Sequence, residues 1–157
     1  MSEETKNRKF SKVLYSSKSV EWATPQEFFD QLDEEFHFTL DPCCTHENAK
    51  CEKHFTKEEN GLEQDWGKEI VFMNPPYGRG IIDEWMQKAY EASLVGATVV
   101  CLVPARTDTR WFFDYAMKGE IRLVKGRIKF GDGSNSATFP SVIVIFRPPA
   151  DDQKMAA

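Results

Sequence analysis

Two spacings of apolar residues alternate along the chain, and they separate the helices from the strands that we predict. In "ATPQEFFDQLDEEF" the apolar positions recur every three or four residues, which predicts a helix from about Pro25 to Phe36. Thr24 is placed to cap this helix, Pro25 fits its first position, and Glu27 completes a capping box. The same spacing predicts further helices from Ile81 to Gly96 and from Thr109 to Met117, the last ended by Gly119.

Short apolar runs rich in β-branched residues predict the strands. "EIVFMN" (69–74) and "ATVVCLVP" (97–104) are long enough for buried strands, and the second is typical of a strand covered on both faces. "HFTLD" (37–41) predicts a shorter strand. In the last third "EIRLVKG", "GRIKFGDG" and "SVIVIFRPP" predict three more. Between Cys43 and Gly61 the chain is polar, and we expect a helical turn near His46 to Cys51 and then a loop.

Strands that alternate with helices and end in a hairpin predict an α/β fold with a mostly parallel sheet and a C-terminal antiparallel hairpin. With 157 residues the chain is long enough for one domain with a hydrophobic core and too short for two. We place this domain at residues 21–147. Residues 1–20 lack apolar periodicity and are expected to form a flexible basic arm, and residues 148–157 a disordered tail.

Composition favours an intracellular globular protein. Hydrophobic residues make up 41% of the chain and charged residues 29%, as in ordinary globular proteins. No apolar run approaches the roughly 20 residues of a membrane helix, and the polar start "MSEETKNRKF" is not a signal peptide. We therefore expect a cytoplasmic protein that has no membrane partner.

Four cysteines, Cys43, Cys44, Cys51 and Cys101, are expected to be reduced thiols in such a protein. Three of them lie near histidines in "CCTHENAKCEKH". Zinc sites usually pair CxxC or HxxxH elements, which this string lacks, so we prefer small buried thiols and predict no metal. A structural zinc ion stays open as the alternative.

The formal net charge of −5 hides an uneven distribution. Residues 21–70 hold four basic and fourteen acidic residues, whereas residues 1–20 hold five basic and two acidic, and residues 101–130 seven basic and three acidic. A polyanion would meet the local basic faces and not the total charge. Because basic runs also commonly serve only to solvate a surface, both interpretations stay open.

Polar residues follow three of the predicted strands. Asp41 follows "HFTL", Asn74 follows "IVFM", and Arg106 comes shortly after "VVCLVP". In open α/β sheets ligands bind outside the carboxyl ends of the strands, so we expect these three ends to converge on one crevice.

The stretch "NPPY" at Asn74 to Tyr77 resembles the catalytic motif of amino-group methyltransferases that use S-adenosylmethionine. Together with "WATPQEFFDQL", "FTLDPC", "GLEQDW" and "LVPARTDTRWF", in this order, it makes the chain from about Glu21 to Phe146 resemble the compact phage-type DNA N6-adenine methyltransferases, the phage Dam family. The resemblance implies a Rossmann-like S-adenosylmethionine-dependent methyltransferase sheet and methyl transfer to N6 of an adenine flipped out of DNA. A plain turn is the alternative for "NPPYG" taken alone.

The resemblance assigns catalysis to Asn74, Pro75, Pro76 and Tyr77. The adenine amine is a poor nucleophile because its lone pair is delocalised into the ring. Asn74 Oδ1 and the Pro75 carbonyl would each accept one N–H hydrogen bond and free the lone pair, while Tyr77 would stack on the flipped base. Proline suits the motif because its φ is fixed and it has no N–H. The reaction then depends on in-line positioning more than on a strong base.

The resemblance also implies a site for S-adenosylmethionine. Thr24 and Pro25, at a helix N-terminus, would lie near its carboxylate. Asp41 and Pro42 would lie near its amino group, and Asp65 near its adenine. The implied cofactor residues are Trp22, Thr24, Pro25, Asp41, Pro42, Asp65 and Asn74. Larger methyltransferases carry a Gly-rich loop after the first strand, and "DPCCTHENAK" departs from that pattern.

Double-stranded DNA is the partner that we expect. The residues expected to contact it are Tyr77, Arg79, Arg106, Arg110, Lys125, Arg127 and Lys129, and contacts of such cations with phosphates depend strongly on salt. The chain has no room for a large target-recognition domain, so loops or the final hairpin would read the bases. We predict no obligatory protein partner and expect a monomer or a weak dimer.

Two other functions stay open. The NPPY motif also occurs in enzymes that methylate a protein glutamine, and related sequences act on cytosine N4, although the basic residues after the motif favour nucleic acid. The other alternative is a non-catalytic nucleic-acid-binding module of the same fold. The intact motif from Asn74 to Tyr77 argues against it.

Overall fold

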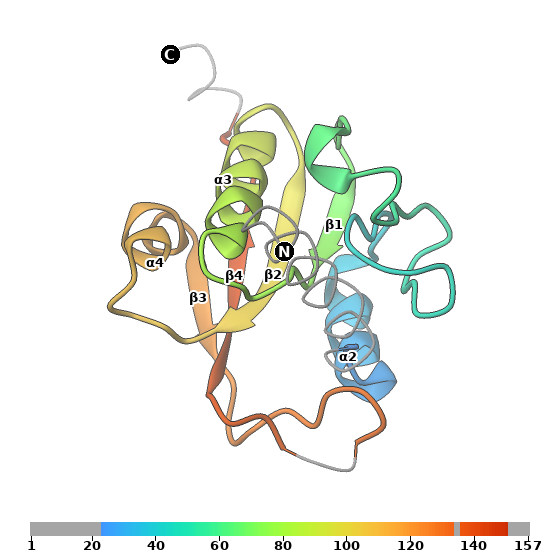
Figure 1. Ribbon diagram of the computed structural model, residues 1–157. Helices are drawn as coiled ribbons and strands as arrows, with labels where there is room; N and C mark the ends of the chain where they lie inside the picture. Colours follow the sequence, from blue (N-terminus) through green and yellow to red (C-terminus); the bar gives the residue numbers. More distant parts are fainter. Residues whose placement is uncertain (1–22, 134–135, 151–157) are drawn as a thin grey trace, which may run out of the picture.

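The computed structural model describes residues 23–133 and 136–150 (Figure 1). In these residues four strands form one mixed sheet in the order β1-β2-β4-β3. β1 (Ile70–Met73) runs parallel to β2 (Thr98–Pro104), whereas β4 (Ser141–Phe146) is antiparallel to both β2 and β3 (Glu120–Leu123). The predicted α/β class and antiparallel C-terminal pair are confirmed. The sheet is not mostly parallel, because β4 enters between β2 and β3 in the opposite direction.

Helices form where the three-to-four spacing predicts them. Phe29 of α2 (Gln26–Phe36) is buried and its ring stands edge-on to that of Phe72 in β1, with 5.1 Å between centroids. α3 (Ile81–Leu94) connects β1 to β2 and packs against β2. The shorter elements are α4 (Arg110–Asp114) and the 3-10 turns η1 (Gly61–Glu63) and η2 (Ala116–Lys118).

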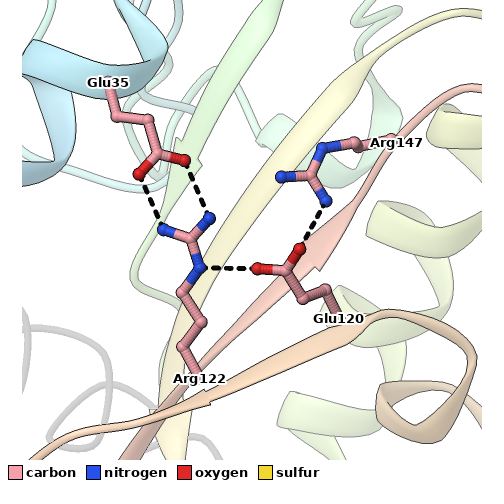
Figure 2. A network of polar contacts seen from close by, with 4 residues as sticks. All are labelled: Glu35, Glu120, Arg122 and Arg147. Atoms are coloured by element: carbon pink, nitrogen blue, oxygen red, sulfur yellow. Dashed lines mark hydrogen bonds and ion pairs between the residues drawn. The ribbon is translucent and has the colours of Figure 1, made fainter.

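A surface network of ion pairs ties the end of α2 to the edge strand β3 (Figure 2). Arg122 of β3 donates to both carboxylate oxygens of Glu35 over 2.8 Å. Glu120 accepts from Arg122 and also from Arg147 over 2.9 Å. The arginine partners lower the pKa of the two glutamates. The network thus fastens one end of the helix whose other end lies beside Asn74.

The predicted capping box of α2 is wrong. Pro25 occupies the N-cap position and no side chain caps the helix. The hydroxyl of Thr24 instead accepts a hydrogen bond from Nδ2 of Asn74. The third predicted helix is also shorter than expected, because the backbone leaves helical geometry at Tyr115 and continues as η2 until Gly119.

Several predicted local structures are irregular. "HFTLD" forms only single bridges, from Leu40 to Val71 and from Asp41 to His54, both parallel. Residues 46–51 form a turn and bends, not a helical turn. "GRIKFGDG" is not a strand, because three of its glycines have positive φ and break the pleat. These three are Gly126, Gly131 and Gly133.

The core lies along the inner strands. Every residue of β4 is buried, and β2 is buried from Val99 to Pro104, as its continuous apolar sequence predicts. In the part of the chain that the structure describes, no helix has the length and apolar character needed to span a membrane. The expected N-terminal arm and the end of the expected tail lie outside the described residues.

Candidate active site

Polar side chains meet where β1 ends. Leu40 bridges Val71 in parallel fashion, so Asp41 and Asn74 follow neighbouring segments at the same edge of the sheet. Lys50 joins Asp41 to the first turn of α2, because its N–H donates to Asp41 Oδ2 over 3.0 Å and its Nζ to Gln26 Oε1 over 2.9 Å. Hydrogen bonds therefore bring together the start of α2, the Asp41 segment and the end of β1. Arg106, after the third strand end, contacts the carbonyl of Tyr77. That these ends form one ligand site stays a prediction.

The amide of Asn74 is held from both sides. Its Nδ2 donates to Oγ1 of Thr24 over 3.0 Å. Its Oδ1 accepts from the hydroxyl of Tyr77 over 2.6 Å. Thr24 and Tyr77 are buried, with 6% and 4% of their surface exposed, and Asn74 is half-buried. This amide is thus fixed at the end of β1, and neither partner is a charged group.

Tyr77 lies inside an aromatic cluster. Its hydroxyl lies 3.2 Å from the carbonyl oxygen of Leu102 in β2, in addition to its bond with Asn74. The rings of Phe130 and Phe139 stand nearly perpendicular to the tyrosine ring, at centroid distances of 6.3 and 5.7 Å. Burial raises the pKa of the phenol, so Tyr77 is neutral and keeps its proton to donate. The predicted stacking on a base stays a prediction.

The turn after Asn74 leads directly into α3. Pro75 is buried and Pro76 half-buried, and the described residues contain no cis peptide bond. The N–H groups of Ile81 and Ile82 donate to the carbonyl of Gly78, which starts the helix. Because neither proline has an N–H, the backbone of Pro75 and Pro76 offers carbonyl acceptors and no donors.

Asp41 is a buried carboxylate with 4% of its surface exposed. Burial raises the pKa of its carboxyl to about 6, while the backbone N–H groups of Lys50 and Cys43 act in the opposite direction. The Cys43 N–H lies 3.3 Å from Oδ1. A buried acid whose pKa is shifted by desolvation is a candidate functional group.

The cysteine and histidine segment does not gather a metal site in the described residues, where no three His, Cys, Asp or Glu side chains are grouped to hold an ion. Cys43, Cys44 and Cys51 are half-buried free thiols, and burial raises the pKa of each. His46 Nδ1 lies 2.9 Å from His54 Nε2. Since His54 Nδ1 faces the carbonyls of Cys51 and Glu52, His54 accepts from His46 when both rings are neutral.

A comparison with family models decides what this site belongs to. Residues 11–156 match the model described as DNA N-6-adenine-methyltransferase (Dam). The chain belongs to this Dam family. It is 31% identical over 152 residues to "DNA N-6-adenine-methyltransferase" of Escherichia phage T1, an alignment that covers 80% of this chain and 62% of the phage protein. It is 36% identical over 64 residues to "Putative methyltransferase YfdM" of Escherichia coli strain K12, which covers 36% of this chain and 70% of that protein.

Two facts follow for this Dam family member. A methyltransferase family implies a methyl donor. The chain spans less than two thirds of the length of its phage T1 relative, since the alignment covers 62% of that protein.

The residues predicted for the donor of a Dam family enzyme are only partly brought together. Thr24, Pro25, Asp41 and Asn74 lie on the segments that hydrogen bonds bring together at the end of β1, and Pro42 is buried next to Asp41. Asp65 is exposed and accepts from the N–H of Gly67 over 2.8 Å, in the segment that precedes β1. It therefore lies before the amino end of β1, whereas Asn74 follows the carboxyl end. Trp22 lies outside the described residues.

The basic residues predicted to contact DNA differ in their surroundings. Arg106 is engaged by the protein: its Nη1 donates to the Tyr77 carbonyl over 3.2 Å and its guanidinium lies 5.9 Å from the Phe139 ring centroid. Arg127 Nη1 reaches the Ala137 carbonyl over 3.5 Å. All six of these basic residues are nevertheless exposed: Arg79, Arg106, Arg110, Lys125, Arg127 and Lys129.

Sequence reasoning missed Lys50, Phe130, Phe139 and Gly61. An ideal Cβ on Gly61 would lie 2.1 Å from the carbonyl oxygen of Pro42, so only glycine fits beside the Asp41 segment. A glycine between two polar stretches predicts a turn, and it does not predict this close approach.

An open groove of about 360 Å³ lies between η1 and α3, and its lining includes none of the candidate site residues Thr24, Asp41, Asn74 and Tyr77.

Proposed function

We propose that this protein is a DNA adenine-N6 methyltransferase that transfers a methyl group from S-adenosylmethionine to an adenine flipped out of double-stranded DNA. The observation that carries the proposal is the fixed amide of Asn74 at the end of β1, beside the buried carboxylate of Asp41. Membership in the Dam family and the name of the phage T1 relative support the choice of adenine N6.

In the proposed reaction, Asn74 acts on the target amine. A carbonyl oxygen accepts two hydrogen bonds, so the bond from Tyr77 does not by itself exhaust Oδ1. Oδ1 and the Pro75 carbonyl each accept one N–H of the amine and turn its lone pair out of the ring system. No strong base is required before attack, because the nitrogen becomes acidic only after it is alkylated. The contribution of the protein is therefore orientation and not proton abstraction.

We propose a Rossmann-like arrangement for the donor site. β1 and β2 are parallel neighbours joined through α3, which is the unit that places ligands outside the carboxyl ends of strands. The chemistry of the residues present suits S-adenosylmethionine, since the start of α2 offers N–H groups to a carboxylate and Asp41 offers a charge partner to an ammonium group. When bound, this cofactor supplies an electrophilic methyl group on a sulfonium.

DNA would approach the crevice along exposed basic residues. Arg79 follows the motif from Asn74 to Tyr77, and Arg110 begins α4. Lys125 and Lys129 lie in the β3–β4 connection, whose Phe139 contacts Tyr77. Contacts of these side chains with phosphates would orient the duplex without reading its sequence.

Incubation of the protein with unmethylated DNA and methyl-labelled S-adenosylmethionine tests the proposal. Label should enter DNA with the wild-type protein and fall by at least about a hundredfold with Asn74→Ala, which removes a group proposed to act in the transition state. Gln87→Ala, which removes an exposed amide on α3, is the matched control and should keep wild-type activity. Absence of label from DNA with a folded wild-type protein, or label that Asn74→Ala retains in full, would contradict the proposal.

A further inference from the structure

We propose that Tyr77 is a positioning residue that acts through its hydroxyl group, which holds the amide of Asn74 in the orientation that methyl transfer requires. The inference rests on the proposed function. It assigns to this chain a role for the phenol oxygen that is separate from stacking of the ring on a base.

The two hydrogen-bond lengths fix which way the amide faces. The 2.6 Å between the Tyr77 hydroxyl and Asn74 Oδ1 fits an O–H···O bond, and the 3.0 Å between Asn74 Nδ2 and Thr24 Oγ1 fits an N–H···O bond. With oxygen and nitrogen exchanged, the shorter contact would join a nitrogen to the phenol oxygen at less than the usual N–H···O range, which begins at about 2.7 Å. Both lengths therefore agree with Oδ1 on the Tyr77 side and Nδ2 on the Thr24 side.

The phenol oxygen lies against a second strand. It is 3.2 Å from the carbonyl oxygen of Leu102, in the fully buried part of β2, and its single proton serves the shorter contact with Asn74. The ring is 4% exposed and cannot move sideways without displacing its neighbours. Tyr77 thus links the position of Asn74, at the end of β1, to the neighbouring strand β2.

The surroundings of the ring favour the hydroxyl role over the stacking role. Phe130 and Phe139 stand at 76° and 84° to the tyrosine ring. Arg106 holds the Tyr77 carbonyl and lies over the Phe139 ring. Stacking of a base on Tyr77 requires this packing to rearrange, whereas donation to Asn74 requires no movement.

The hydrogen bond from Tyr77 affects the direction in which Asn74 Oδ1 faces the target amine. A bond from Tyr77 to one lone pair of Oδ1 fixes the plane of the Asn74 amide, and with it the direction in which this oxygen can meet the target amine. Methyl transfer needs an in-line approach, and a rotated amide would present an N–H group to the amine and repel it. Loss of the phenol oxygen should therefore lower turnover and leave binding of both substrates intact.

Tyr77→Phe tests this, because it keeps the ring and removes only the hydroxyl. We expect kcat for methyl transfer to DNA to fall at least about tenfold, while KM for S-adenosylmethionine and Kd for DNA stay within about twofold. Tyr90→Phe is the matched control: it removes the hydroxyl of a half-buried tyrosine on α3 that packs against Phe146, and it should leave all constants unchanged. A kcat of Tyr77→Phe within about twofold of wild type would overturn the proposal.

A second measurement stands apart from activity and from the folding of any variant. In the wild-type protein, the side-chain amide protons of Asn74 should exchange with solvent at least about tenfold more slowly than those of the exposed Gln87. Exchange as fast as that of Gln87 would contradict a fixed amide, even if DNA is methylated. Slow exchange without any methyl transfer would support a fixed Asn74 amide and would contradict the proposed function instead.

Discussion

Nδ2 of Asn74 donates to Oγ1 of Thr24 over 3.0 Å, which joins the end of β1 to the residues before α2 across fifty positions of sequence. The threonine is buried and its hydroxyl does not cap the helix that it precedes. The start of α2 is therefore held next to the candidate catalytic residue Asn74, and Glu35 holds the end of the helix to β3. A displacement of this helix should therefore change the orientation of the Asn74 amide.

Replacement of Thr24 by valine removes the acceptor for Asn74 and keeps a similar shape. We expect the free energy of unfolding to fall by about 1 kcal/mol, as for the loss of one hydrogen bond, and methyl transfer to fall at least about tenfold. Thr24→Ser keeps the hydroxyl and should retain most of the activity. Denaturant unfolding and initial rates measure the two effects. Equal activity of the valine and serine variants would show that the hydroxyl does not orient Asn74.

Arg106 and Arg110 should respond differently to salt. Arg110 is exposed at the start of α4, and its replacement by alanine should reduce the slope of log Kd for DNA against log salt by about 0.9, the value for one phosphate contact. Arg106 contacts the Tyr77 carbonyl and Phe139, so Arg106→Ala should lower kcat without changing that slope. Titrations at several salt concentrations separate the two cases, and a reduced slope for Arg106→Ala would return this residue to the DNA surface.

Gly61 should tolerate no side chain. A Cβ at this position would lie 2.1 Å from the carbonyl oxygen of Pro42, which is backbone and cannot move aside. We expect Gly61→Ala to destabilise the fold by on the order of 3 kcal/mol or more. In Gly78→Ala the new Cβ meets first the flexible end of Ile81 at 3.0 Å, so the loss should be much smaller. Thermal or denaturant unfolding of the two variants gives the comparison, and similar losses would contradict the close approach.

The affinity for S-adenosylmethionine should depend on Asp41. Burial raises the pKa of its carboxyl to about 6, so the group is largely ionised at pH 7 and largely protonated at pH 5. Because only the ionised form attracts an ammonium group, affinity should fall by up to about tenfold between pH 7 and pH 5. Calorimetric titration measures this. Asp41→Asn should bind weakly with little change over the same range, and a flat profile for the wild type would exclude Asp41 as the charge partner.

Much of the fold could be predicted because its signals are local. The helical spacing before Phe36 and after Ile81, and the apolar run of β2, depend on a few neighbouring residues. The pairing of β4 between β2 and β3 could not be predicted in this way, since strand order is set by contacts far apart in the chain.

The same difference between local signals and long-range contacts applies to the candidate site. Asn74 could be identified from its position after an apolar strand and before two prolines. The role of Thr24 was misjudged, because its hydroxyl meets a partner fifty residues away and not the adjacent helix. Phe130 and Phe139 reach Tyr77 from the connection between β3 and β4, and the spacing of apolar residues does not predict such a contact.

The central claim concerns the chemical product, and mass spectrometry of nucleosides tests it most directly. DNA that lacks methylated bases is incubated with the wild-type protein and S-adenosylmethionine and then digested to nucleosides. The account predicts N6-methyldeoxyadenosine, which disappears with Asn74→Ala. N4-methyldeoxycytidine as the product, or no methylated nucleoside from a folded protein that binds both DNA and S-adenosylmethionine, would contradict it.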